Sequence, residues 1–163
     1  MRSLPTIPRR NSRHRAYPAH PSPVRRHNAP VILLLTVCTY PRQDVLNSIQ
    51  AHDAFLAAWG TARRWAVGTY TIMPDHVHLF CAPRDLGNEP VKSWARYWKR
   101  VLGNEAPQLR GKLQWDGWDT QMRDQEHYLR KLEYVRLNPV RKGLVADADA
   151  WPYSGTVNPL DWL

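Results

Sequence analysis

Two histidines separated by one residue, His76 and His78, are the first side chains in this sequence that suggest chemistry. They begin residues 76–82, where polar and apolar residues alternate before the sequence becomes wholly apolar, which predicts a β-strand. Residues two apart on a strand project from the same face, so the two imidazoles would stand side by side while Val77 packs on the opposite face. Two neutral imidazoles directed at one point supply half of a divalent-metal site. The alternative is that the pair has only a structural role.

A second group of reactive side chains lies near the end of the chain, in residues 124–138. Apolar residues recur there at helical spacing, which predicts an amphipathic helix: Leu129, Leu132 and Val135. Pro139 should end or kink this helix, because the residue before a proline avoids helical angles. Tyr134 and Asn138 are four residues apart and should share a face. The same helix carries two cations one turn earlier, near that face: Arg130 and Lys131. An interfacial tyrosine followed by a helix-ending asparagine would be the structural interpretation.

The two groups together suit metal-dependent phosphoryl transfer. His76, His78 and Asn138 would offer two nitrogens and one oxygen to a cation such as Mg²⁺ or Mn²⁺. Tyr134 is then a plausible covalent nucleophile, activated by the metal or by a neighbouring cation such as Lys131. A covalent bond between the tyrosine and a backbone phosphate conserves the energy of the phosphodiester bond that was cleaved, so the strand can be rejoined without ATP. A second chemistry stays open, in which the histidines activate water and the chain is a metal-dependent hydrolase.

Four separated motifs resemble the REP-associated tyrosine transposases, a branch of the single-tyrosine HUH transposases that act on single-stranded DNA. The resemblance runs from about residue 31 to residue 155, and its motifs are residues 73–79, residues 115–119 with Arg123, residues 134–145 and residues 151–154. They match, in order, the family's His-hydrophobic-His strand, a tryptophan-containing landmark, the catalytic-tyrosine helix with the segment after it, and a second tryptophan landmark. Asp75 stands where the family often has asparagine.

The resemblance implies a role for each site residue. His76 and His78 would bind the metal, Asn138 would complete the protein ligands, and Tyr134 would be the nucleophile. The family joins itself to the 5′ side of the break and frees a 3′ hydroxyl. Its substrate is a DNA hairpin from repetitive extragenic palindromes, beside a short single-stranded foot that sets the cleavage site. Relatives include monomers and homodimers, so both states stay open, and a domesticated hairpin-binding protein without transposition activity is the main functional alternative.

Tyr128 is a rival nucleophile because it lies on the same predicted helix. Four residues beyond it stands Leu132, which can ligate no metal, whereas Asn138 follows Tyr134 at that spacing. We therefore expect Tyr128 to pack and Tyr134 to react.

The charge of the chain agrees with a nucleic-acid partner. The 163 residues carry a net charge of +9, with a pI near 10.0. Residues 1–30 hold seven arginines and no acidic residue, so residues 31–163 carry only +2. Residues 1–30 are also rich in proline and lack periodicity, which predicts a disordered tail that adds sequence-independent affinity for DNA. The alternative is that residues 1–30 have no function. An organelle-targeting presequence is a poor match, because the prolines in this segment oppose an amphipathic helix.

Within the balanced part of the chain, one segment concentrates positive charge. Four cations recur at helical spacing in a helix predicted over residues 90–102: Lys92, Arg96, Lys99 and Arg100. We expect this face to contact DNA phosphates together with Arg130 and Lys131, while the aromatic residues of the helix mostly form a core-facing stripe.

The order of predicted elements is typical of an α+β fold. Strands are expected at 31–39, 65–72, 76–82 and near 112–121, helices at 47–64, 90–102 and 124–138, and the last residues should be irregular. This order predicts a ferredoxin-like antiparallel sheet with helices on one face, the architecture of the HUH endonucleases, in one domain over residues 31–163. The last helix must then carry Tyr134 across to the histidine face.

The apolar run 31–37 is too short to span a membrane, and two unpaired cysteines suit a reducing compartment. We therefore expect a cytoplasmic protein at the bacterial nucleoid.

Overall fold

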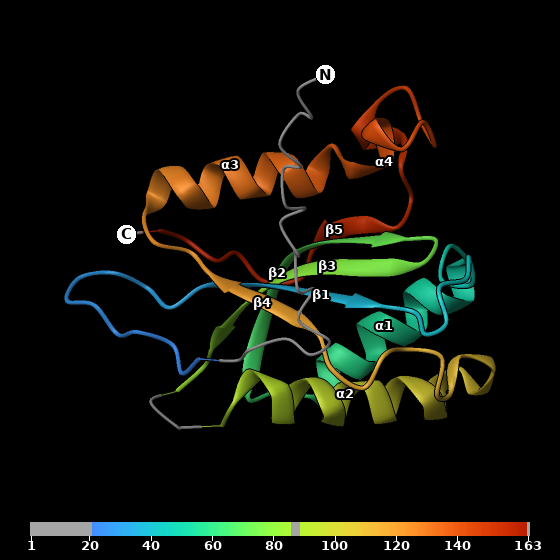
Figure 1. Cartoon of the computed structure of the whole chain (residues 1–163), viewed down its shortest axis with the longest axis horizontal. Helices are drawn as coiled ribbons and strands as arrows, with labels where there is room; N and C mark the ends of the chain where they lie inside the picture. Colours follow the sequence, from blue (N-terminus) through green and yellow to red (C-terminus); the bar gives the residue numbers. More distant parts are fainter. Residues whose placement is uncertain (1–20, 86–88, 163) are drawn as a thin grey trace, which may run out of the picture.

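Five antiparallel strands form the centre of the computed structural model, which describes residues 21–85 and 89–162 (Figure 1). Their order across the sheet is β4-β1-β3-β2-β5. The strands are β1 (Leu33–Cys38), β2 (Trp65–Met73), β3 (His76–Pro83), β4 (Trp118–Gln121) and β5 (Ser154–Thr156). The strand that carries both histidines therefore lies in the middle, with a neighbour on either side. Such a position fixes its backbone on both edges.

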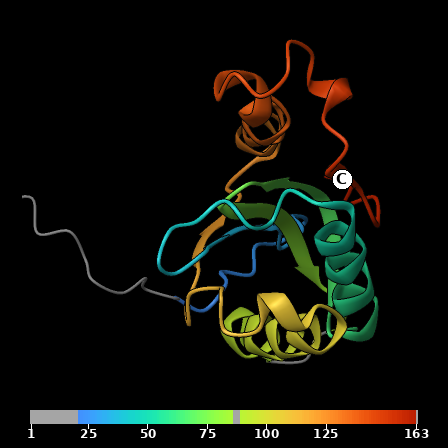
Figure 2. The same ribbon diagram turned by 90° about the vertical axis from the view of Figure 1, so that its right-hand side faces the viewer.

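The helices lie on both sides of this sheet (Figures 1 and 2). Helices α1 (Ile49–Thr61) and α2 (Val91–Glu105) pack against each other and cover one face. Helix α3 (Gln125–Arg136) crosses the opposite face and is followed by the short helix α4 (Asn138–Arg141). Two 3₁₀ turns, Pro107–Leu109 and Ala148–Ala150, complete the regular structure.

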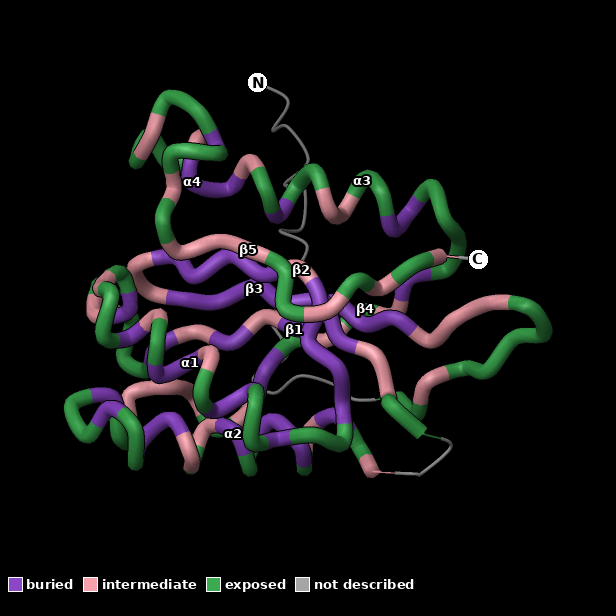
Figure 3. The backbone as a smooth tube through the Cα atoms, turned by 180° about the vertical axis from the view of Figure 1, so that it is seen from behind, coloured by how far each residue is buried: buried purple, intermediate pink, exposed green. Residues whose placement is uncertain are grey.

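Alternation along β3 explains why the two faces of the sheet differ. Val77, Leu79 and Cys81 point into the larger core, which α1 and α2 close with Phe55, Trp59, Trp94 and Trp98. His76, His78 and Phe80 point to the other face. There Phe80 joins a smaller apolar cluster under α3 with Tyr128 and Val135. Figure 3 shows this arrangement: the central strands β1, β2 and β3 are mostly coloured as buried, as are the inward sides of the helices, whereas the edge strands β4 and β5 are not.

Helix α3 is held above the sheet at its beginning and in its first half. The Asp124 side chain accepts a hydrogen bond of 2.7 Å from the backbone N–H of His127 and so caps the helix. One turn later, Tyr128 packs edge-to-face on Phe80 and donates its hydroxyl to the carbonyl of Leu160 at 2.8 Å. The C-terminal segment therefore ties α3 to the sheet, upstream of Tyr134.

The predicted fold class is confirmed. The chain has an α+β fold with an antiparallel sheet, α1 and α2 lie on one face of the sheet, and α3 lies on the histidine face. Two of the strands differ from the sequence prediction. Residues 154–156, expected to be irregular, form β5 because they pair with β2 at Thr69–Thr71. The strand expected near 112–121 is shorter, because Leu113 pairs with Thr39 only as an isolated bridge and regular pairing with β1 begins at Trp118.

Gly117 marks the point where the chain enters β4, and the sequence needs a glycine there for space. A Cβ on Gly117 would lie 3.0 Å from the carbonyl oxygen of Thr36 and from Cγ2 of Val37. Because the nearest atom is backbone, we expect Gly117→Ala to lower the free energy of unfolding by about 1–3 kcal/mol in a denaturant titration. Gly60→Ala is the matched control, since nothing lies within 4 Å of a Cβ there. In helix α1 it should be neutral or stabilising by up to about 1 kcal/mol. An equal effect of both substitutions would contradict this account of Gly117.

The first part of the predicted tail lies outside the described residues, which begin at residue 21. Residues 21–30 make defined contacts with the domain. The backbone N–H and carbonyl of Val24 pair with the side-chain amide of Gln121, and the Arg26 guanidinium donates to the carbonyl of Arg123 at 2.6 Å. Contacts with the sheet edge therefore start before residue 31, where the sequence places the domain boundary.

Two further expectations concern the cysteines and the membrane. Cys81 is buried and Cys38 is half-buried, and both are free thiols. Within the described ranges, no helix combines the length and the apolar character that a membrane span requires.

Candidate metal and tyrosine site

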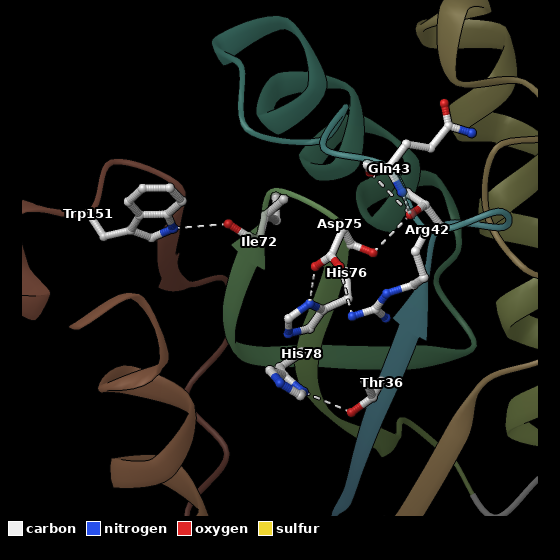
Figure 4. A network of polar contacts seen from close by, with 9 residues as sticks. Thr36, Arg42, Gln43, Ile72, Asp75, His76, His78 and Trp151 are labelled. Carbon is white, nitrogen blue, oxygen red and sulfur yellow. Dashed lines mark hydrogen bonds and ion pairs between the residues drawn. The ribbon is translucent and has the colours of Figure 1, made fainter. Parts of the chain in front are cut away.

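The two histidines lie next to each other on β3, as the His-x-His spacing predicts (Figure 4). Their ring centroids are 4.7 Å apart and the rings are nearly perpendicular. Both residues are mostly buried, each with 7% of its surface exposed. The backbone of β3 pairs with Cys38 and Thr36 on one side and with Met73 and Thr71 on the other, so both imidazoles project from a fixed frame.

His76 is oriented by the residue before it in the sequence. Its Nδ1 lies 2.7 Å from Oδ1 of Asp75, and the other carboxylate oxygen of Asp75 lies 2.8 Å from Nη2 of Arg42. An ionised carboxylate only accepts hydrogen bonds, so Nδ1 of His76 carries the proton and Nε2 is left with a free lone pair. Burial acts to raise the pKa of Asp75, but the hydrogen bond from His76 and the charge of Arg42 outweigh it and hold the pKa low. Asp75 is therefore a charged partner whose charge Arg42 balances.

His78 is oriented in the same way by the neighbouring strand. Its Nδ1 lies 2.8 Å from the hydroxyl oxygen of Thr36 on β1. Burial, followed by the nearby His76 and Lys131, lowers the pKa of His78 from 6.5 to about 3. Burial is also the largest factor that lowers the pKa of His76, against the effect of Asp75. Both imidazoles are therefore neutral at physiological pH, the state in which histidine binds metals.

Tyr134 lies beside this pair, on α3. Its ring meets that of His78 at an angle of 71°, with a centroid distance of 6.0 Å. Tyr134 is 42% exposed, which leaves its ring accessible from solvent. All these residues come from one chain, so a single copy brings the nucleophile candidate to the histidines.

Cations surround the tyrosine. The Nζ of Lys131 lies 5.4 Å from the centre of the Tyr134 ring, and the guanidinium carbon of Arg141 lies 4.7 Å from it. A third cation, Lys142, is close enough to His76 to lower the pKa of that imidazole. Positive charge here favours the binding of a phosphate group. Lys131 was predicted from the sequence, whereas Arg141 and Lys142 were not. These two residues follow Pro139, at the end of α4, and Arg141 reaches the Tyr134 ring from there.

Asn138 is the first residue of α4 and is buried, with 5% of its surface exposed. Helix α3 ends at Arg136, so Tyr134 and Asn138 do not share one continuous helix as the spacing predicted. Helix α4 packs against β2, and its C-cap residue Lys142 donates its backbone N–H to the carbonyl of Asn138 at 3.0 Å. Helix α4, with Asn138 as its first residue, lies on the same side of the sheet as α3, which is the histidine side (Figure 1). Its position as the third metal ligand stays a prediction.

The donor set fits a divalent cation. Both Nδ1 atoms are engaged by Thr36 and Asp75, which leaves the two Nε2 atoms for a metal. In the part of the chain that the structure describes, no third histidine, cysteine or carboxylate joins them as a metal-binding group. A remaining protein ligand would then be an amide oxygen, such as that of Asn138, with water and substrate oxygens around it. Such a mixed set suits Mg²⁺ or Mn²⁺.

Thr36 offers a test of this arrangement that spares the ligands themselves. Thr36→Val keeps the shape of the side chain and removes the oxygen that holds His78. We expect the affinity for Mn²⁺ to fall by about 10- to 100-fold, because partners of this kind fix the orientation of the ligand ring. The measurement is a calorimetric titration of the purified protein with Mn²⁺. Thr69→Val, at an exposed pair with Thr156 on the β2 edge, is the control and should leave the affinity unchanged.

The other predicted DNA contacts divide between two sides of the sheet. Arg130 and Lys131 belong to α3, on the tyrosine side, and Arg130 pairs there with Glu126. The remaining four lie on α2, on the opposite side: Lys92, Arg96, Lys99 and Arg100. Lys92 forms an ion pair of 2.8 Å with Asp116, and Lys99 donates to the carbonyls of Gln114 and Trp115. The predicted cations therefore do not form one continuous surface with the tyrosine.

Tyr128, the rival nucleophile, has a different environment. It is buried at 6% exposure between Phe80 and Trp162, and its hydroxyl already donates to the carbonyl of Leu160. Burial also raises the pKa of the Tyr128 phenol. The packing role expected from the sequence agrees with these contacts.

The last landmark of the sequence, residues 151–154, borders the site on β2. The indole N–H of Trp151 donates to the carbonyl of Ile72 at 2.9 Å (Figure 4). The backbone N–H of Ile72 donates to the carbonyl of Tyr153. Arg136 of α3 reaches Asp149 in the preceding turn at 3.0 Å. These contacts connect the end of α3, the turn after α4 and the sheet. They therefore hold the end of α3, which carries Tyr134, in a fixed position relative to the sheet.

Comparison with known proteins gives a consistent result. No family model matches the chain. The REP-associated tyrosine transposase of Escherichia coli (strain K12) is 22% identical over 107 residues, which are 61% of this chain. The chain spans 64% of the length of that curated relative. A solved structure of a REP-associated tyrosine transposase bound to a REP hairpin superposes with a TM-score of 0.68 and 22% identity, covering 80% of each chain. Sequence and fold thus confirm that the chain is similar to the REP-associated tyrosine transposases.

Proposed function

We propose that this chain is a transposase-like enzyme that cleaves and rejoins single-stranded DNA through a covalent bond to Tyr134. The observation that carries the proposal is the contact of the Tyr134 ring with His78, whose Nδ1 is held by Thr36 while its Nε2 is left for a metal. A nucleophile candidate next to a metal-binding pair is the arrangement that phosphoryl transfer needs.

In the proposed reaction the Tyr134 oxygen attacks a backbone phosphorus and loses its proton. The bond between that phosphorus and the 3′ oxygen of the preceding nucleotide breaks, and this oxygen takes up a proton. The products are a 5′-phosphotyrosine and a free 3′ hydroxyl. Attack of a 3′ hydroxyl on the phosphotyrosine reverses the step and restores the tyrosine.

The residues around Tyr134 would each contribute to this step. His76, His78 and Asn138 would hold a divalent cation, which supplies charge stabilisation at the phosphate when bound. Arg141 and Lys131, which lie beside the Tyr134 ring, would contact the phosphate and stabilise its negative charge. Asp75 would keep His76 in the tautomer whose Nε2 is free, and Thr36 would hold the orientation of the His78 ring.

The proposed substrate is DNA with a hairpin and a single-stranded foot. The support comes from the solved relative, which is bound to a REP hairpin. Accessible cations on α3 would hold the backbone of the foot near Tyr134. A single copy already brings Tyr134 to the histidines, so a monomer could act, and a homodimer is the other state that fits.

A domesticated hairpin-binding protein is the second candidate. It would keep the fold and the DNA surface without cleaving. The neutral, oriented histidines beside an accessible tyrosine favour the enzyme, because binding alone requires none of them.

A covalent-trapping assay tests the proposal. The protein is incubated with end-labelled oligonucleotides that carry palindromic hairpins from its own genome, with Mg²⁺ or Mn²⁺ or with EDTA, and the products are separated on denaturing gels. We expect a protein–DNA adduct that forms only with the metal. Cleavage without an adduct would support a water-using hydrolase, and tight binding without cleavage would support the domesticated form.

A further inference from the structure

A cleft of about 530 Å³ lies on the side of the sheet away from Tyr134, and none of the chemistry above uses it. It opens between the second half of α2 and the segment 109–115 that leads towards β4. Its charged lining residues are all cationic: Arg96, Lys99, Arg100 and Arg110. Among the described residues that line it, none is acidic. A concave surface whose charged residues are all cationic attracts an anionic ligand.

Two accessible aromatic rings stand at this cleft. Trp115 is 73% exposed and Tyr97 is 39% exposed. The guanidinium of Arg96 lies 4.7 Å from the centre of the Trp115 ring, and that of Arg100 lies 5.2 Å from the centre of the Tyr97 ring. Large exposed rings are costly to leave in water, whereas aromatic rings beside arginines are suited to stacking a base and contacting its phosphate.

The position of Trp115 is fixed before any ligand arrives. Lys99 donates to the carbonyl of Gln114 at 3.0 Å and to that of Trp115 at 2.7 Å. Lys92 holds the next residue through its 2.8 Å ion pair with Asp116. The two lysines of α2 therefore act on the loop, and they leave the arginines to face the cleft. A loop held in this way loses little conformational freedom when a ligand binds.

We propose that this cleft, lined by Trp115, Tyr97, Arg96, Arg100 and Arg110, is a second binding site for single-stranded DNA. A base would stack on Trp115, and the arginines would contact the adjoining phosphates. The nature of the ligand rests on the proposed function, because DNA is the polyanion on which such an enzyme acts. The site differs from the tyrosine site in position, since α2 and α3 cover opposite faces of the sheet (Figure 2). It would hold a segment of strand away from the cleaved phosphate.

The test measures binding in EDTA, where metal-dependent cleavage does not proceed. The probe is a fluorescein-labelled oligo(dT) of eight nucleotides without a hairpin, and the readout is fluorescence anisotropy. We expect Trp115→Ala to weaken binding by about 5- to 100-fold, the loss of one base–aromatic stack. Trp115→Phe should restore most of the affinity, and Arg100→Gln should weaken binding and reduce its dependence on salt. Arg84→Gln, at an exposed arginine bonded to Asn158 outside the cleft, is the control and should bind like the unaltered protein.

A second measurement locates the strand. Oligo(dT) with one 5-iododeoxyuridine is photo-crosslinked to the full chain, and the attached peptide is identified by mass spectrometry. Crosslinks at Trp115 or Tyr97 would support the site. Crosslinks only around Tyr134, or Trp115→Ala and Arg100→Gln variants that bind like the unaltered protein, would overturn it. Displacement of the probe by poly-glutamate as readily as by unlabelled oligo(dT) would also overturn it, in favour of an acidic peptide.

The outcome is separable from that of the proposed function. Tyrosine adducts with hairpin DNA, together with oligo(dT) binding that ignores Trp115, would retain the enzyme and remove the second site. Trp115-dependent binding without any adduct would retain the second site on a DNA-binding protein.

Discussion

Tyr134→Phe should abolish the covalent protein–DNA adduct and reduce strand cleavage by roughly 10³-fold or more, while hairpin binding changes by less than about twofold. The substitution removes only the hydroxyl. The ring keeps its contact with His78 and its place beside Arg141 and Lys131, because these contacts are made by ring atoms. The measurements are adduct formation on denaturing gels and hairpin binding by anisotropy, both with Mn²⁺.

Tyr128→Phe is the matched control for this substitution. It removes a hydroxyl from the same helix, where the oxygen donates to the carbonyl of Leu160. We expect it to lower the free energy of unfolding by about 1 kcal/mol and to leave the adduct intact. Cleavage that survives Tyr134→Phe at an unchanged rate would instead point to water as the nucleophile.

Replacing either histidine of the pair should have the second large effect. With His76→Ala or His78→Ala, one of two nitrogen ligands is lost from a site that otherwise offers oxygen. We expect Mn²⁺ affinity to fall by at least about 100-fold, since even partners behind a ligand contribute about 10- to 100-fold. Cleavage at a fixed, limiting Mn²⁺ concentration should fall at least in proportion.

Calorimetric titration with Mn²⁺ and cleavage assays over a range of metal concentrations check this prediction. His52→Asn is the control. His52 is a partly buried histidine on α1, which covers the other face of the sheet, and it bonds to the hydroxyl of Tyr70 on β2. It should keep the metal affinity of the unaltered protein. If His78→Ala bound Mn²⁺ and cleaved like the unaltered chain, the proposed metal site would be wrong.

The sequence predicted those features that depend on local periodicity. Alternation in residues 76–82 placed both histidines on one face, and the helical spacing around Tyr134 predicted α3 together with the packing of Tyr128. The order of strands and helices predicted an antiparallel sheet and the placement of α3 on the histidine face. Such patterns depend only on residues that are close together in the chain, so they can be recognised in a single sequence.

Features that depend on distant pairing were missed. Thr36 and Arg42 orient the histidines from elsewhere in the chain, across the sheet and from the loop after β1, and no spacing relates them to residues 76–78. β5 is only three residues long and exists because the edge of β2 accepts it. Helix α4 separates Asn138 from α3, since a proline after Asn138 permits a new helical turn in a new direction. Tertiary contacts decide each of these cases.

Helix α2 shows the same difference between local periodicity, which the sequence predicts, and tertiary contacts, which it does not. The spacing of Lys92, Arg96, Lys99 and Arg100 correctly predicted one helical face, but not which cations remain available. Two lysines hold the loop at residues 114–116, and the arginines line a cleft with Trp115. Positive charge in a sequence therefore indicates affinity for a polyanion, whereas the structure assigns the individual contacts.

Identification of the residue that carries the DNA is the most direct test of the central claim. The adduct formed with a labelled hairpin oligonucleotide and Mn²⁺ is digested with a protease, and the labelled peptide is sequenced by mass spectrometry. The account predicts a single modified residue, Tyr134, in the peptide that spans α3, with no label when EDTA replaces the metal. A label on another tyrosine, such as Tyr128 or Tyr97, or cleavage that leaves no residue modified, would contradict it.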